Sequence, residues 1–134
     1  MKKLYTSNYA RNSKHPKAMS ISAVAPRWYK GKAYLDLAPT WDFLNEYKEG
    51  KIDQVEYTKR YMNLLLNVRQ LDPQKVVDDL EDGTVMLCYE SPNDFCHRHI
   101  VAKWLMDNTD VIVEELLEKT PKKPTKLVDE ILEF

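Results

Sequence analysis

The chain has 134 residues, of which 43% are hydrophobic and 31% charged, enough for one domain with a hydrophobic core. No run of residues approaches the roughly 18 apolar positions of a membrane-spanning helix, and the start, Met1–Tyr5, lacks the apolar stretch of a signal peptide. Two cysteines are too few for a disulfide-rich scaffold, so we expect a cytoplasmic protein that does not associate with membranes.

The net charge of −1 conceals an uneven distribution. Residues 1–35 carry eight Lys or Arg and no acid, whereas the remaining 12 basic and 21 acidic residues give −9. Two interpretations stay open: the basic segment meets an anionic partner, or it docks on acidic helices of its own domain.

Alternating small and β-branched residues predict short strands at Lys3–Tyr9 and Met19–Ala25, joined by a polar loop. Pro26 ends the second strand, Arg27–Lys32 is expected to be an exposed loop, and Ala33–Leu37 is an ambiguous extended piece.

From Thr40 onwards the hydrophobic period becomes helical. Thr40 is a candidate N-cap, Trp41 and Leu44 share one face, and Gly50 suits the C-terminal end. Asp53 with Glu56 resembles a capping box that starts a second helix. A third, short helix is predicted from Pro73 to about Leu80, and Asp82-Gly83 then turns the chain into the strand Thr84–Glu90.

The last predicted elements are a helix from Phe95 to about Met106 and two further helical patterns separated by Pro121–Pro124. The continuously apolar run within Thr84–Glu90 is typical of a strand covered on both faces. We therefore predict an α/β fold: a small Rossmann-like three-layer domain with a short, mainly parallel sheet and helices on both faces. We assign residues 1–120 to this single domain and residues 121–134 to a C-terminal helical tail.

In such sheets ligands bind beyond the carboxyl ends of the strands. The helix after the third predicted strand opens with Cys96-His97-Arg98, where unpaired N–H groups and the helix dipole favour an anion. Arg98 is the predicted phosphate contact, with a salt bridge to Asp94 or Glu90 as the alternative. The candidate ligand-binding residues at this edge are Thr6, Ser7, Asn8, Arg11, Arg27, Cys88, His97 and Arg98.

Cys96 and Glu90 are the candidate catalytic residues. A thiol at a helix start beside an arginine is readily ionised and nucleophilic, although a small buried filler is an equal alternative. Glu90 can act as a general acid or base or bind a ribose hydroxyl, and its alternative role is that of a solvated carboxylate. His97 falls on the buried arc of its helix, so we expect one ring nitrogen to bond a backbone carbonyl or a carboxylate.

Cys88, Cys96 and His97 or His99 offer soft metal ligands, but their spacing matches no standard zinc motif, and a fourth ligand would have to come from His15 or Glu90. We therefore predict no metal and no cofactor. A zinc site or a Cys88–Cys96 redox pair remains a further alternative.

Two motifs, Leu87-Cys88-Tyr89-Glu90 and Phe95-Cys96-His97-Arg98-His99, resemble the DUF488 family of uncharacterised bacterial and phage proteins. Tyr47–Ile52 is similar to the middle of that family, and the resemblance spans about residues 3–107. It places Cys88, Glu90, Cys96, His97 and Arg98 at the motif positions. Many members have Gly-His-Ser after the first strand and Asp-Val-Arg at the second, where this chain has Thr6–Tyr9 and Ser22–Pro26.

These observations favour a protein that binds a phosphorylated ligand, either a nucleotide or a nucleic-acid end, between the strand end Cys88–Glu90 and the helix start Cys96–Arg98. Thiol- or carboxylate-dependent chemistry is compatible with this arrangement. The alternative is a non-catalytic module that binds nucleic acid or an acidic protein through the basic N-terminal segment.

Overall fold

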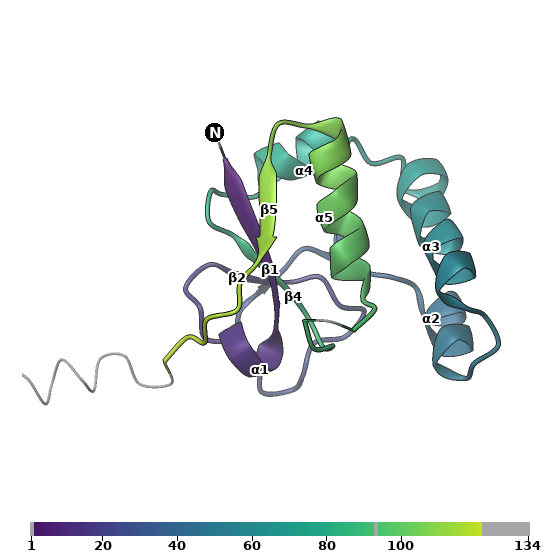
Figure 1. Ribbon diagram of the computed structural model, residues 1–134, viewed down its shortest axis with the longest axis horizontal. Helices are drawn as coiled ribbons and strands as arrows, with labels where there is room; N and C mark the ends of the chain where they lie inside the picture. Colours follow the sequence, from purple (N-terminus) through teal and green to yellow (C-terminus); the bar gives the residue numbers. More distant parts are fainter. Residues whose placement is uncertain (1, 93, 122–134) are drawn as a thin grey trace, which may run out of the picture.

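The computed structural model describes residues 2–92 and 94–121, which form a parallel sheet with helices against it (Figure 1). The sheet has five strands in the order β3-β2-β4-β1-β5. Every pairing is parallel. The strands are β1 (Lys3–Asn8), β2 (Ala18–Ser20), β3 (Lys32–Ala33), β4 (Val85–Cys88) and β5 (Ile112–Glu115).

The helices lie mainly between β3 and β5 along the chain. They are α1 (Tyr9–Asn12), α2 (Trp41–Lys48), α3 (Gln54–Asn63), α4 (Pro73–Asp79) and α5 (His97–Asn108). A 3₁₀ turn spans Leu35–Leu37, and a π-helical turn, Leu64–Val68, continues α3. Figure 1 shows α5 between the sheet and the α2–α3 pair.

The sequence predicts N-caps at Thr40 and Asp53. Thr40 is the N-cap of α2 but makes no side-chain capping hydrogen bond, whereas Asp53 makes one. The Asp53 carboxylate accepts a hydrogen bond from the Glu56 N–H at 2.8 Å and starts α3. Gly50, with φ of +75°, turns the chain between α2 and α3 through a conformation that side chains disfavour. Together these residues fix where α2 ends and α3 begins.

The main core lies between the sheet and α5. Successive side chains of a strand alternate between faces, so Leu4 of β1, Met86 of β4 and Val113 of β5 point to the same side. Val101 and Leu105 of α5, both fully buried, pack against them. This apolar layer anchors α5 across the middle of the sheet and thereby places its N-terminus at the carboxyl ends of the strands.

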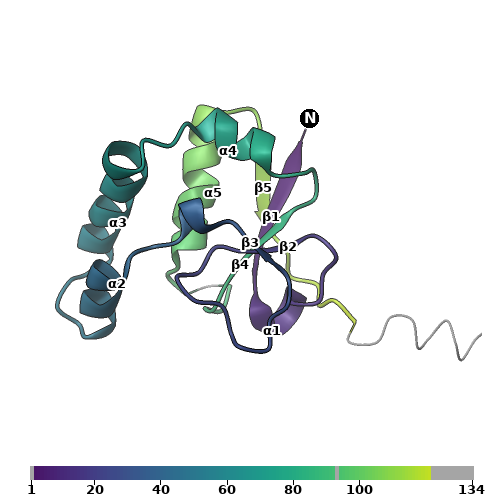
Figure 2. The same cartoon turned by 180° about the vertical axis from the view of Figure 1, so that it is seen from behind.

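The second face of the sheet carries a thinner cover. Val85 and Leu87 point to this side and pack with Tyr9 of α1 and with Tyr29 from the connection between β2 and β3. The view from behind in Figure 2 shows the connections around β2 and β3. The predicted α/β class with a parallel sheet is confirmed, and among the described residues the helix that covers this face is the single turn α1.

Three local predictions were wrong. The segment after Asn108 was expected to be helical, but Ile112–Glu115 forms β5, because pairing with the open edge of β1 outweighs the helix-forming tendency of its glutamates. β2 ends at Ser20, short of the predicted Ala25. α5 begins at His97, with Cys96 as its N-cap, instead of at the predicted Phe95. The predicted C-terminal helix lies outside the described residues.

No helix within residues 2–92 and 94–121 combines the length and apolar character needed to cross a membrane.

Candidate functional site

A cavity of about 510 Å³ opens beyond the carboxyl ends of β2 and β4. Five parts of the chain enclose it: the segment after β2, one face of α2, Tyr57 of α3, the end of β4 and the start of α5. The lining residues used below are Trp41, Tyr47, Lys48, Tyr57, Cys88, Glu90, Phe95, Cys96 and His97. Its position is the one at which parallel α/β sheets receive ligands.

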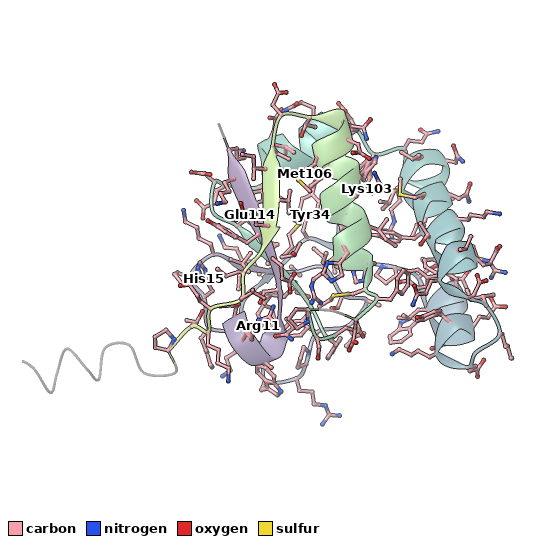
Figure 3. All side chains as sticks on the ribbon, viewed as in Figure 1. Arg11, His15, Tyr34, Lys103, Met106 and Glu114 are labelled. Atoms are coloured by element: carbon pink, nitrogen blue, oxygen red, sulfur yellow. A yellow bond between two sulfur atoms is a disulfide. The ribbon has the colours of Figure 1, made fainter. Side chains whose placement is uncertain are left out.

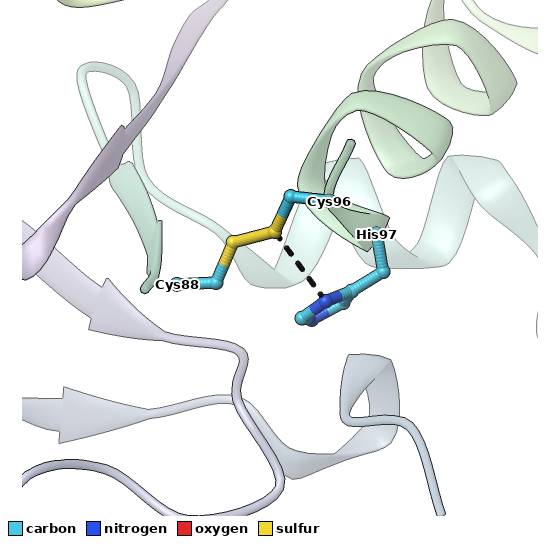
Figure 4. Close-up of side chains that lie close together, drawn as sticks. All are labelled: Cys88, Cys96 and His97. Atoms are coloured by element: carbon cyan, nitrogen blue, oxygen red, sulfur yellow. Dashed lines mark hydrogen bonds between the residues drawn. A yellow bond between two sulfur atoms is a disulfide. The ribbon is translucent and has the colours of Figure 1, made fainter. Parts of the chain in front are cut away.

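Cys88, Cys96 and His97 form a buried cluster on one side of the cavity (Figure 4). Cys88 is the last residue of β4, and Cys96 immediately precedes α5, so the helix start is held against the strand end. The two sulfurs are joined in a disulfide, and the Cys96 Sγ lies 3.7 Å from His97 Nδ1. A disulfide sulfur carries no thiolate, so a nucleophilic role for Cys96 requires the reduced state.

The tautomer of His97 follows from its hydrogen bond. Its Nε2 lies 2.6 Å from the carbonyl oxygen of Ile21. A carbonyl can only accept, so Nε2 carries the proton, as the sequence predicted for a ring nitrogen bonded to the backbone. Burial lowers the pKa of His97 to about 4, and the ring is therefore neutral near pH 7. Nδ1 consequently presents a lone pair toward the Cys96 sulfur.

Aromatic rings form the wall opposite the strand ends. Tyr47, Tyr57 and Phe95 make a three-ring cluster with centroid separations of 5.2–5.3 Å. Trp41, from the first turn of α2, is 49% exposed and lines the same cavity. Flat π-surfaces in this arrangement suit a planar ring as ligand.

Two charged side chains, Glu90 and Lys48, contribute to the lining. Burial raises the pKa of Tyr57, and the negative charge of Glu90, which lines the same cavity, raises it further. The Glu90 carbonyl accepts a hydrogen bond from the Asn8 side chain at 3.2 Å, which ties the end of β1 to the segment after β4. Lys48 lies in the last turn of α2 and is exposed.

Arg98 belongs to a different, internal site. Its side chain is fully buried and makes two hydrogen bonds to the Glu115 carboxylate, at 3.2 Å from Nε and 3.0 Å from Nη2. Nη1 donates to the Cys88 sulfur at 3.0 Å, and Nη2 donates to the Ser91 carbonyl. Arg98 thus bridges β4, β5 and the loop before α5.

The Glu115 carboxylate also accepts hydrogen bonds from Arg11 and Thr6 at this end of the sheet. Arg11, which Figure 3 labels beside α1, donates to it at 2.6 Å. The Thr6 hydroxyl also donates to it, at 2.6 Å. Burial alone would raise the pKa of Glu115, but the hydrogen bonds from Arg98, Thr6 and Arg11 outweigh it and lower the pKa. Ser7 accepts from Arg11 at 3.1 Å. This internal ion-pair network locks the carboxyl ends of β1 and β5 to the start of α5.

The predicted site residues therefore separate into two groups. Cys88, Glu90, Cys96 and His97 line the cavity, whereas Arg98, Arg11, Thr6 and Ser7 surround Glu115. Asn8 caps α1 and bonds the Glu90 backbone between them. Arg27 is exposed on its loop and does not line the cavity. Arg98 forms the salt bridge that was its predicted alternative role, but with Glu115 instead of Asp94 or Glu90.

Sequence reasoning missed Glu115 and most of the aromatic wall. Glu115 lay in a segment predicted to be helical, so its neighbours could not be inferred. One signal did point to the wall: Trp41, Leu44 and Tyr47 share a face of α2, and this face lines the cavity.

The basic N-terminal segment divides into equal halves. Lys2, Lys3, Arg11 and Lys17 bond acceptors of their own domain. Lys14, Arg27, Lys30 and Lys32 are exposed. These contacts of the first four are not with acidic side chains of helices: Lys2 and Lys17 bond backbone carbonyls, and Lys3 and Arg11 pair with glutamates of β5.

A family model named DUF488-N3a, described as the active DUF488-N3 subclade, matches residues 4–109. This chain belongs to the DUF488 family. The resemblance that the Cys-Tyr-Glu and Cys-His-Arg motifs predicted over about residues 3–107 is confirmed. No curated protein and no solved structure matches the chain. Within this DUF488 protein, the first motif supplies Cys88 and Glu90 to the cavity, and the second supplies Cys96 and His97 to it.

Proposed function

We propose that this DUF488 protein binds a phosphorylated nucleoside, as a free nucleotide or as the end of a nucleic acid, in the cavity beyond β2 and β4. The observation that carries the proposal is the combination of an aromatic wall with one cation and one carboxylate in a single cavity. Its volume of about 510 Å³ falls within the range of roughly 300–1,000 Å³ typical of small-molecule sites.

The aromatic wall supports a planar ring as the buried part of the ligand. Stacking on an aromatic side chain contributes about 1–3 kcal/mol per base in single-strand binding proteins and tolerates different bases. Trp41 is exposed at this wall, so a base can reach its face without displacing core residues.

Lys48 and Glu90 support the two polar ends of such a ligand. Arg98, the phosphate contact predicted from the sequence, already holds Glu115 and is fully buried, so the proposal assigns the phosphate to Lys48. The Glu90 carboxylate can accept hydrogen bonds from ribose hydroxyls or move a proton. The description of the matched subclade as active agrees with a carboxylate that takes part in chemistry.

The test is a titration of purine and pyrimidine nucleoside monophosphates, together with the corresponding nucleosides, followed by isothermal calorimetry, which needs no tryptophan signal. Trp41→Ala should weaken binding of both ligand types by about tenfold, the equivalent of about 1.4 kcal/mol. Trp28→Ala is the matched control, since Trp28 is 53% exposed and lies outside the cavity lining.

Lys48→Ala separates phosphate recognition from base recognition. It should weaken the binding of nucleotides by about tenfold, because a charged hydrogen bond contributes about 1.5–3 kcal/mol. It should leave the binding of nucleosides unchanged, because they carry no phosphate. Lys59→Ala removes another exposed cation, outside the cavity lining, and should change neither. Nucleotide binding that survives both Trp41→Ala and Lys48→Ala unchanged would refute the proposal, as would the absence of binding by every ligand tested.

A second candidate is the binding of longer nucleic acid by the exposed loop Arg27–Lys32. Arg27, Lys30 and Lys32 are exposed there beside the half-exposed Trp28. Oligonucleotide affinity that falls steeply with salt, with a slope reduced by about one for each of Arg27→Ala and Lys30→Ala, would support it. An affinity independent of salt would exclude it.

A further inference from the structure

We propose that Cys88, Cys96 and His97 of the reduced protein bind a zinc ion, with a fourth coordination position open to the cavity. The inference goes beyond ligand binding and does not rest on it. It concerns other side chains and is tested with the metal alone.

The first argument is the donor set. Among the described residues these three side chains are buried together, and their ligand atoms all lie within 4.8 Å of one another. Two thiolates and one imidazole form the sulfur- and nitrogen-rich set that zinc prefers. Three protein ligands leave one tetrahedral position, and all three residues line the cavity, so water or a ligand can reach that position.

The second, independent argument is the orientation of His97. Its Nε2–H is fixed on the Ile21 carbonyl at 2.6 Å, which leaves the Nδ1 lone pair directed at the cysteine sulfurs. Metal-ligating histidines are commonly held by such a bond from the other ring nitrogen to a backbone carbonyl or a carboxylate. His97 is only 6% exposed, and its Nδ1 has a sulfur as its one polar neighbour.

The third argument is the backbone separation of the cysteines. Their Cα atoms lie 7.4 Å apart, beyond the range of about 4.4–6.8 Å usual for a disulfide. Two sulfurs bound to one zinc ion at about 2.3 Å each lie about 3.8 Å apart in a tetrahedral site. The sulfurs can separate to this distance without bringing β4 and α5 closer together.

Arg98 supports the charged form of the cluster. Its guanidinium donates to the Cys88 sulfur at 3.0 Å, and a positive donor at this position stabilises a thiolate. Glu115 holds that guanidinium in place from the other side. The internal ion-pair network therefore orients the sulfur of one proposed ligand.

The disulfide and the zinc site are alternative states of the same atoms. A cellular dithiol breaks the S–S bond by transferring two electrons and two protons, which leaves two cysteine thiols and the oxidised dithiol. Zinc then displaces the two thiol protons to solvent as its two bonds to sulfur form.

The experiment begins with the full chain reduced by a phosphine, which becomes a phosphine oxide while water supplies the oxygen and the two thiol protons. After the phosphine has been removed without oxygen, Co²⁺ is added as a coloured substitute and then displaced by Zn²⁺. We expect one ion per chain, sulfur-to-cobalt charge-transfer bands, visible bands of tetrahedral intensity, and protection of both thiols from a thiol reagent.

The variants test each ligand. Cys88→Ser, Cys96→Ser and His97→Ala should each weaken Co²⁺ binding by about 100-fold or more, because even the loss of an outer-shell partner costs about 10–100-fold. His15→Ala is the matched control: the His15 Nδ1 accepts from the Lys17 N–H, outside the cluster, and its loss should leave affinity unchanged.

Circular dichroism of each metal-free variant shows whether it folds, and the wild-type spectrum and thiol protection test the site even where a variant does not. A reduced, folded wild type that takes up no Co²⁺, or that gives only octahedral bands, would overturn the proposal. Wild-type affinity in folded His97→Ala would do the same. If Trp41→Ala loses nucleotide binding but still takes up Co²⁺, the result supports a zinc site that does not depend on the nucleotide site.

Discussion

Replacing Glu115 tests whether the internal ion-pair network holds the carboxyl end of the sheet together. Glu115→Gln keeps the shape of the side chain but leaves Arg98, which is fully buried, and Arg11, which is 11% exposed, without their shared anion. Removing one partner of a buried pair costs about 3–5 kcal/mol. Since the Glu115 side chain is 18% exposed, we expect a loss near the lower end, about 3 kcal/mol.

The measurement is urea unfolding at pH 7 under oxidising conditions, followed by circular dichroism. In thermal unfolding of a domain of this size, a loss of about 3 kcal/mol would lower the Tm by about 10 °C. Glu114→Gln is the matched control in the neighbouring position. Its pair with Lys3 spans 3.1 Å between side chains that are 56% and 40% exposed, so solvent screens it and its loss should cost far less stability than the loss of Glu115.

A double-mutant cycle assigns the effect to the pair. The cycle compares the single variants Arg98→Met and Glu115→Leu with the double variant, in which both charges are absent. The double variant should lose less stability than the sum of the two single losses, with a coupling of about 1–3 kcal/mol. Equal losses in Glu115→Gln and Glu114→Gln, or additive losses in the cycle, would refute the role given to this network.

Three further predictions follow from particular contacts. The first concerns pH: the folded-state pKa of Glu115 is lowered from its ordinary value of 4.5, so its ionised carboxylate stabilises the fold above pH 4.5, and this contribution is lost as the pH falls through the lower folded-state pKa. The difference in unfolding free energy between wild type and Glu115→Gln should therefore become smaller in acid. A difference that becomes larger in acid would contradict the assignment. Leu105→Ala removes a fully buried side chain of α5 and should cost about 3 kcal/mol in urea unfolding, whereas Met106→Ala, at a position 43% exposed, should cost less than about 1 kcal/mol; similar costs would contradict the packing. Gly50→Ala should lower the free energy of unfolding by about 1 kcal/mol because of the φ of +75° alone, since a Cβ at this position meets nothing within 4 Å. Gly50→Asn should lower the free energy of unfolding by less. An unchanged free energy of unfolding in both variants would contradict this prediction.

The local elements were predictable where a few neighbouring residues decide them. The Asp53 cap, the turn at Gly83 and the buried strand around Val85–Cys88 each follow from residue type and short-range spacing. The inward orientation of His97 was predictable for the same reason, because it depends on the period of one helix. The family motifs likewise identified Cys88, Glu90, Cys96 and His97, which the cavity brings together.

The role of Arg98 was decided by the tertiary structure. Its partner Glu115 lies 17 residues away on a strand that the sequence pattern did not reveal. Pairing of β5 with the edge of β1 brings that carboxylate beneath the start of α5. A guanidinium at a helix start suits a phosphate and a carboxylate equally well, so only the position of Glu115 determines which of them it meets.

The cavity also depends on the tertiary structure, because its wall and its cysteine–histidine cluster come from distant parts of the chain. Tyr47 and Tyr57 belong to the α2–α3 pair, while Cys88 and His97 belong to β4 and α5. The sequence by itself determined which residues carry chemistry and which helices and strands present them. The distances between those residues were set by long-range packing of α5 on the sheet and of α3 on α5, which no local pattern encodes.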